Sequence, residues 1–146
     1  LRYFNVFGPG EAHKGKMASM VHQLARQMLD GKRPRIFTDG SQARDQVHVD
    51  DVVACNLAAA ADDATPGIYN CGAGVATSFN DIVDALNEAL GADLQPDYFD
   101  NPYRFYQDYT RADLSETTAG LGWQPQRTPR EAIIDYARRL KAAWNG

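Results

Sequence analysis

Apolar side chains recur at helical spacing along residues 17–30, and Gly31 follows where a left-handed helix cap belongs. This pattern predicts an amphipathic helix whose apolar face packs on a core. A serine or threonine followed three positions later by an acidic residue marks two further helix starts. The expected helices span residues 17–30, 78–90, 113–119 and 128–144. A further alanine-rich helix is expected to be capped by Asp50 and to end at about residue 61.

Short runs of β-branched and aromatic residues between turns predict strands at 1–7, 35–37, 46–49, 67–72 and 97–99. Helices that alternate with short strands indicate the α/β class. The longer parallel strands of a doubly wound dinucleotide-binding sheet have no counterpart in this pattern. We therefore expect residues 1–146 to form one α/β unit with short strands and several helices.

The composition is that of an ordinary globular domain, with 44% hydrophobic and 23% charged residues. The net charge of −4 disfavours binding of nucleic acid, which needs clustered positive charge. No stretch approaches the roughly 18 apolar residues of a membrane helix, so we expect a cytoplasmic protein without membrane contact. Cys55 and Cys71 are expected to be buried, reduced thiols, and His22 and His48 to be structural, so no metal site is predicted.

Several segments carry a resemblance to a known family. The runs LRYFNVFGPG (1–10), RDQVHVDDV (44–52) and YNCGAG (69–74) together resemble the second half of extended short-chain dehydrogenase/reductases, which include most nucleotide-sugar epimerases and dehydratases. Within that group, HKGKMAS (13–19) and FYQDYTRADL (105–114) are most similar to the ADP-glyceromanno-heptose 6-epimerases.

The resemblance implies an NADP-dependent epimerase that acts on an ADP-sugar and forms a homo-oligomer when full length. In that family the glycine-rich NADP fingerprint and the catalytic Tyr-x-x-x-Lys pair precede the segment that matches residues 1–6. Neither motif occurs in the 146 residues. We therefore expect residues 1–146 to be the substrate-binding C-terminal half, without the NADP-binding half and inactive alone.

Lys14 is the catalytic residue that the resemblance implies, and it also matches a cofactor contact. An epimerase that returns hydride to the opposite face of a carbon needs a proton-transfer group on each face. Lys14 matches the second of these groups, opposite the tyrosine of the missing motif. The alternative is an exposed loop lysine that only steers a diphosphate.

The resemblance also implies a set of binding residues. Arg44 matches an arginine that grips the nucleotide diphosphate, since a guanidinium fork suits phosphate oxygens, and Asp45 could orient that fork. The alternative for Arg44 and Asp45 is a surface ion pair of little energetic value. The other implied substrate contacts are Asn5, Lys16, Gln23, Phe37, Thr38, Asp39, Gly40 and Tyr106, and Val6 matches a cofactor contact.

Two alternatives to this function stay open from the sequence. One is a UDP- or dTDP-sugar epimerase or dehydratase of the same superfamily, in which the loop lysine would not be expected. The other is a stand-alone ligand-binding or interaction module. An exposed apolar surface along residues 1–7 would count against the second alternative, because it would mark a missing partner.

Overall fold

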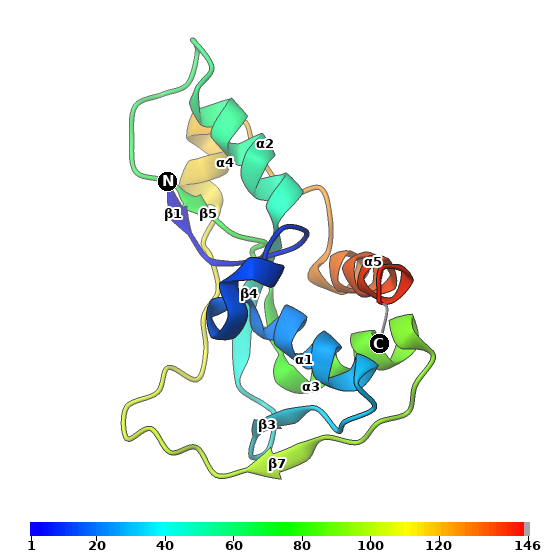
Figure 1. The fold of residues 1–146 in the computed structure, drawn as a ribbon. Helices are drawn as coiled ribbons and strands as arrows, with labels where there is room; N and C mark the ends of the chain where they lie inside the picture. Colours follow the sequence, from blue (N-terminus) through cyan, green and yellow to red (C-terminus); the bar gives the residue numbers. More distant parts are fainter. Residues whose placement is uncertain (145–146) are drawn as a thin grey trace.

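The computed structural model describes residues 1–144 and has the α/β architecture expected from the sequence (Figure 1). The strands are β1 (Arg2–Tyr3), β2 (Asn5–Phe7), β3 (Arg35–Phe37), β4 (Ala43–His48), β5 (Asn70–Cys71), β6 (Ala76–Ser78) and β7 (Asp97–Phe99). The helices are the 3₁₀ helix η1 (Ala12–Met17) and α1 (Met20–Leu29), α2 (Val49–Ala59), α3 (Phe79–Leu90), α4 (Ser115–Leu121) and α5 (Pro129–Ala142).

The strands form three small sheets. β4 is central to one of them, with β2 parallel on one side and β6 antiparallel on the other. The register places Asn5 opposite Gln46. β1 pairs with β5, and β3 pairs with β7, both in parallel. The predicted single strand 1–7 is therefore wrong, because the chain breaks at Phe4 and its two parts join different sheets.

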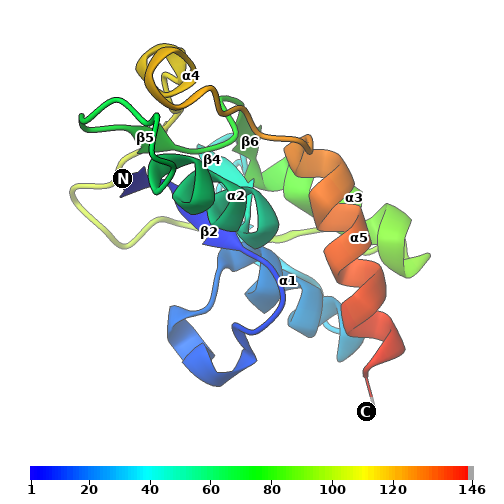
Figure 2. The ribbon, with the colours of Figure 1, turned by 90° about the horizontal axis from the view of Figure 1, so that it is seen from above.

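The main core lies where α1, α3 and α5 meet, and Figure 2 shows α5 lying across α3. Burial of each large apolar side chain there stabilises the fold by about 1.5–3 kcal/mol. Its fully buried members include Phe7, Val21, Leu24, Ile82, Leu86 and Ile133. A smaller cluster lies against α2 and contains Val47, Val52, Cys55, Cys71 and Trp123.

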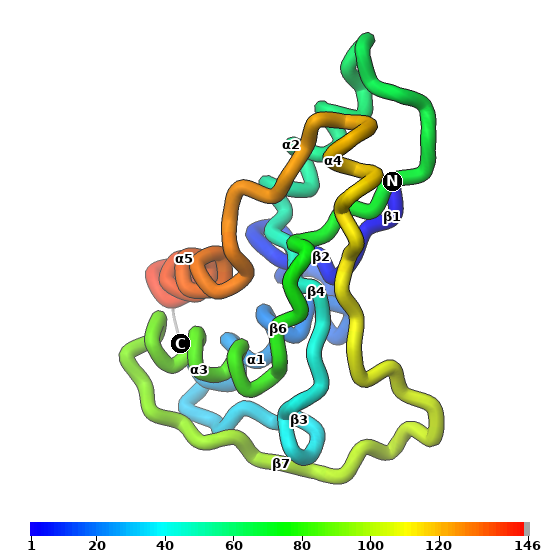
Figure 3. Tube along the Cα trace, turned by 180° about the vertical axis from the view of Figure 1, so that it is seen from behind, coloured from blue at the N-terminus to red at the C-terminus, as the bar shows by residue number. Residues whose placement is uncertain are grey.

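The long segment between β7 and α4 connects the two ends of the molecule. Figure 3 shows it running from the end that carries β3 and β7 to the end that carries α2 and α4. On the way it bonds to β4, where the amide of Ala43 donates to the Asp108 carbonyl (2.8 Å) and the amide of Thr110 donates to the Ala43 carbonyl (3.1 Å). Residues far apart in sequence thereby meet along β4.

Several predicted boundaries need correction. α1 begins at Met20 because Ser19 caps it, accepting from the amide of His22 (3.1 Å). Met17 is 84% exposed and belongs to η1, so its predicted place in the core was wrong. His48, and not Asp50, caps α2, its Nδ1 accepting from the Asp50 amide (3.2 Å).

The predicted starts of α3 and α5 are confirmed by their capping boxes. Ser78 and Asp81 bond reciprocally at α3, and Thr128 and Glu131 do so at α5. α5 ends at Ala142, two residues before the predicted end. None of the helices within residues 1–144 has the length and apolar character needed to cross a membrane.

Candidate functional site

The loop that carries Lys14 connects β2 to α1 and is closed at its base by Glu11. The Glu11 side chain is only 4% exposed. Its carboxylate accepts from the amide of Gly8 (3.2 Å) and from both the amide (2.6 Å) and the hydroxyl (2.9 Å) of Ser19. The sequence reasoning missed Glu11, although an acidic residue directly after Gly-Pro-Gly and before a helix-capping serine could have drawn attention to it.

The two lysines of this loop are exposed on η1. The backbone amide of Lys14 donates to the carbonyl of Glu11 (2.9 Å). Gln23, on α1, uses its side-chain nitrogen to hold the loop, donating to the carbonyls of Ala18 (2.7 Å) and Lys16 (3.2 Å). The structure therefore gives Gln23 a role in holding the loop, and its substrate contact stays a prediction.

A small cavity of about 90 Å³ brings Val6 and Lys14 together with the Gly8–Gly10 turn and Val49. Gly8 is required there, because a Cβ at this position would lie 2.7 Å from Val49 Cγ1. Small-molecule sites usually measure about 300–1,000 Å³. These residues could thus border one edge of a dinucleotide, but they are too few to enclose it.

A second group of predicted residues forms an aromatic cluster with an arginine. Phe37 lies edge-on to Tyr106, with ring centroids 5.2 Å apart, and also contacts Phe99 at 5.0 Å. The guanidinium of Arg44 lies 4.9 Å from the Tyr106 ring centroid. It donates to the carbonyls of Ala43 (2.9 Å) and Gln107. An arginine that lies over one aromatic ring, with further aromatic rings beside it, can serve both a base and a diphosphate.

The turn after Phe37 is held by Asn80 at the start of α3. The Asn80 side chain donates to the carbonyl of Asp39 (2.9 Å), and its backbone amide donates to the carbonyl of Gly40 (3.1 Å). Gly40 has a φ of +77°, and a Cβ there would lie 2.1 Å from Asn80 Oδ1. Hydrogen bonds from Ser41 lower the pKa of the exposed Asp39 carboxyl. Asn80 also escaped the sequence reasoning.

Asp45 does not orient Arg44, which corrects the sequence expectation. Its side chain is completely buried. The carboxylate accepts from the backbone amides of Ala73 (2.6 Å), Gly74 (2.8 Å) and Ala112 (3.0 Å). Successive side chains of a strand point to opposite faces, so Arg44 and Asp45 serve different surfaces. Asp45 joins the loop after β5 to the segment before α4.

Asn5 lies on β2, beside β4, and its side-chain nitrogen donates to the carbonyl of Asp45 (3.1 Å). Its side-chain oxygen has no hydrogen-bond partner among the described residues. Asn5 and Arg44 thus stand on neighbouring strands of one sheet. The sheet thus carries residues of both candidate groups. Val6 on β2 lines the small cavity with Lys14, and Arg44 on β4 belongs to the aromatic cluster.

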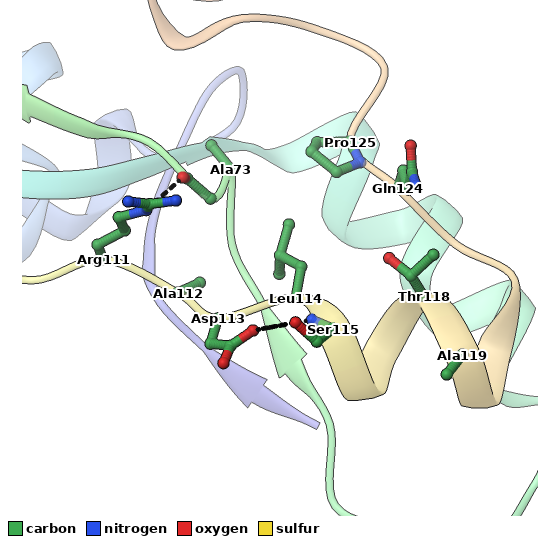
Figure 4. A pocket seen from close by; sticks show the side chains of 11 residues that line it. Ala73, Arg111, Ala112, Asp113, Leu114, Ser115, Thr118, Ala119, Gln124 and Pro125 are labelled. Atoms are coloured by element: carbon green, nitrogen blue, oxygen red, sulfur yellow. Dashed lines mark hydrogen bonds between the residues drawn. The ribbon is translucent and has the colours of Figure 1, made fainter.

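A larger hollow, about 970 Å³, lies elsewhere (Figure 4). It is bordered by the loop at Gly74, the segment 111–115 and α4, and contains none of the predicted site residues. Its two charged side chains already make hydrogen bonds within the chain, because Arg111 donates to the carbonyl of Gly74 (2.9 Å) and Asp113 accepts from the Ser115 amide and hydroxyl. Its size alone therefore gives no reason to move the candidate site there.

The remaining titratable groups singled out in the sequence are buried. Burial lowers the pKa of His22, whose Nδ1 lies 2.8 Å from the Tyr136 hydroxyl, and it also lowers the pKa of His48. Burial raises the pKa of the Cys71 thiol to about 12, and Cys55 is buried as expected. Within residues 1–144 no group of three or more His, Cys, Asp or Glu side chains has the geometry of a metal site.

Comparison with known proteins gives consistent relatives. Residues 1–72 match the NAD dependent epimerase/dehydratase family. An ADP-L-glycero-D-manno-heptose-6-epimerase of Brachyspira hyodysenteriae is 41% identical over 145 residues, which make up 97% of this chain and 45% of that protein.

Solved structures agree with that finding. The crystal structure of the Helicobacter pylori ADP-L-glycero-D-manno-heptose-6-epimerase matches with a TM-score of 0.87 and 39% identity, covering 97% of this chain and 43% of that one. The UDP-glucose 4-epimerase of Thermotoga maritima, solved with UDP-glucose, matches with a TM-score of 0.86 and 32% identity, covering 97% and 45%. The chain thus spans less than half the length of each of these relatives.

Proposed function

We propose that the chain belongs to the NAD dependent epimerase/dehydratase family, which residues 1–72 match, and that it is the sugar-nucleotide-binding part of an ADP-heptose 6-epimerase. The proposal covers residues 1–146 as the substrate-binding half, with the cofactor held mainly by another half of the same enzyme. It is supported by relatives that carry this activity in their names and match nearly the whole chain.

The observation that carries the proposal is the placement of Arg44 over Tyr106 beside Phe37. Sugar nucleotides present an aromatic base and a diphosphate close together, and this cluster offers aromatic faces next to a permanent positive charge. The neighbouring turn adds the exposed side chains of Thr38 and Asp39, whose oxygens a ribose hydroxyl could reach. Although the chain has a net charge of −4, the positive charge of Arg44 would attract an anionic ligand to this cluster.

The cofactor that we propose is NADP, which would supply hydride removal and return. Val6 and Lys14, at the small cavity beside the Gly8–Gly10 turn, would lie against its edge. Lys14 would donate or accept the proton on one face of the reacting carbon, where an acid/base group commonly contributes 10²–10⁴-fold, roughly, to the rate. Asn5 would offer its amide to a sugar hydroxyl.

The proposal can be tested by calorimetric titration of the complete protein that carries this chain with ADP and with UDP. We expect ADP to bind more tightly than UDP. Arg44→Ala should weaken ADP binding roughly 10- to 150-fold, the loss expected for a hydrogen bond to a charged group. Arg111→Ala, an arginine at the separate hollow, serves as the matched control and should leave the affinity unchanged.

Two results would contradict this proposal. Tighter binding of UDP than of ADP would favour a UDP-sugar enzyme of the kind represented by the Thermotoga maritima structure. Equal affinities of the Arg44→Ala protein and the parent would remove Arg44 from the site. Steady-state kinetics test the role of Lys14 in proton transfer separately from the role of Arg44 in binding. Lys14→Ala should lower kcat roughly 100-fold or more while the KM stays nearly constant.

A further inference from the structure

Glu11 has no part in the function proposed above, although its carboxylate is one of the most buried charged groups in the described chain. We propose that Glu11 is a positioning residue that fixes Lys14 for proton transfer, an inference that rests on the proposed function. Three features support it: the bonds at the loop base, the bond to Lys14 itself, and the connection to the helical core.

The carboxylate joins the two ends of the Lys14 loop. Oε1 accepts from the amide of Gly8 (3.2 Å) and the hydroxyl of Ser19 (2.9 Å), while Oε2 accepts from the amide of Ser19 (2.6 Å). Gly8 directly follows β2 and Ser19 directly precedes α1. One side chain therefore holds both ends of the loop, through three hydrogen bonds to its two oxygens.

The backbone of Glu11 acts on Lys14 directly. Its carbonyl accepts from the Lys14 amide (2.9 Å), which starts the turn of η1. The Lys14 ammonium group has no hydrogen-bond or ion-pair partner among residues 1–144. Glu11 thus neutralises no charge on Lys14. It fixes where the Lys14 backbone stands and leaves the ammonium group available to a ligand.

The loop base is also joined to the helical core. The Ser19 hydroxyl that donates to Glu11 accepts from the amide of His22 on α1 (3.1 Å). The His22 ring lies 2.8 Å from the Tyr136 hydroxyl on α5. A buried carboxylate destabilises the fold unless it is hydrogen-bonded. The loop therefore favours the arrangement in which the Glu11 carboxylate accepts all three of its hydrogen bonds. The position of Lys14 follows from that arrangement.

The test uses kinetic measurements on the complete protein with the ADP-linked heptose as substrate. Glu11→Gln keeps the side-chain size but turns one acceptor oxygen into a donor that faces an N–H group. We expect kcat to fall roughly 10-fold or more with the KM changed less than about threefold. Asp51→Asn is the matched control, because Asp51 is also 4% exposed and accepts from the Gln126 amide (2.9 Å) away from the loop.

A double mutant separates positioning from general damage. If Glu11 acts through Lys14, then adding Glu11→Gln to Lys14→Ala should lower kcat no further. A merely structural loss would lower kcat again by the same factor as in the single variant. Should Glu11→Gln fail to fold, Ser19→Ala removes one of the three bonds together with the side-chain cap of α1, and it should lower kcat in the same way, again without effect in the Lys14→Ala background.

The outcomes distinguish this inference from the proposed function. A normal kcat for Lys14→Ala would overturn the catalytic role of Lys14, and the positioning role with it. A low kcat for Lys14→Ala with an unchanged kcat for Glu11→Gln and Ser19→Ala would overturn the positioning role alone. Additive losses in the double mutant would do the same.

Discussion

Asp45→Asn should destabilise the fold strongly without removing any residue from the proposed binding cluster. The carboxylate of Asp45 is fully buried and accepts three backbone amides. These amides come from the loop after β5, at Ala73 and Gly74, and from Ala112 before α4. No other side chain in the described residues accepts from these amides, so they depend on Asp45 alone.

The magnitude follows from how the bonds are divided between the two oxygens. Oδ1 accepts only from Ala73, whereas Oδ2 accepts from both Gly74 and Ala112. An asparagine would place its nitrogen at the Oδ1 position, because that choice breaks one bond instead of two. The loss of one bond to a charged acceptor and the weakening of the other two give about 2–4 kcal/mol.

Urea denaturation of the parent and the variant measures this difference. With a slope of about 2 kcal/mol per molar urea, the middle of the usual range, the midpoint should fall by roughly 1–2 M. Asp113→Asn is the control, since this exposed carboxylate also accepts from a backbone amide, that of Ser115 (2.9 Å), and should shift the midpoint far less. A loss below about 0.5 kcal/mol for Asp45→Asn would refute the reasoning, because surface substitutions fall in that range.

Two further predictions concern the turn at Gly40 and the buried histidines. Gly40→Ala should lower the thermal midpoint more than Gly91→Ala, because both have positive φ but only at Gly40 would a Cβ collide with Asn80; equal shifts in a thermal scan would contradict this. Burial lowers the pKa of His22 and His48 below the ordinary 6.5. As the pH falls through 6.5, these histidines therefore bind protons more readily in the unfolded chain than in the folded chain. Stability in urea should therefore decline as the pH falls through 6.5 and below, and His22→Gln should reduce the slope; a flat profile would show that the folded histidines titrate normally.

The sequence predicted the helix starts well where the signal was local. The capping boxes at Ser78 and Thr128 depend on residues three positions apart, and both are present. It failed at α2, where the cap is His48, because an imidazole can accept from an amide only when its Nδ1 is unprotonated. Burial favours that neutral form, and burial is decided by the whole fold.

The strands were predicted less well because their pairing partners lie far away in the chain. β6, Ala76–Ser78, carries no alternating apolar pattern and exists because it pairs with β4. The predicted strand 1–7 is divided at Phe4 for the same reason, since β1 pairs with β5 and β2 pairs with β4. Local sequence preference cannot specify which of two sheets each half will join.

The candidate site was predicted through residues that could touch a ligand, and the structure brings Phe37, Arg44 and Tyr106 together as that prediction requires. Their part in binding stays a prediction. The residues that were missed, Glu11 and Asn80, hold backbone groups in place. A carboxylate or amide of this kind looks like any other polar residue in a sequence until its distant partners are known.

Arg44 and Asp45 show why adjacent polar residues in a strand should not be assumed to act as a pair. Because side chains alternate along a strand, Asp45 lies on the face where the backbone amides of Ala73, Gly74 and Ala112 donate to it, and Arg44 lies on the opposite face. Arg44 is free to lie over an aromatic ring because no carboxylate among residues 1–144 binds it. This arrangement requires that Asp45→Asn lowers the stability without lowering the affinity for ADP. It also requires that Arg44→Ala lowers the affinity without lowering the stability. The same separation would be impossible if the two side chains formed the ion pair that their order in the sequence suggests, because removing either one would then weaken both properties together.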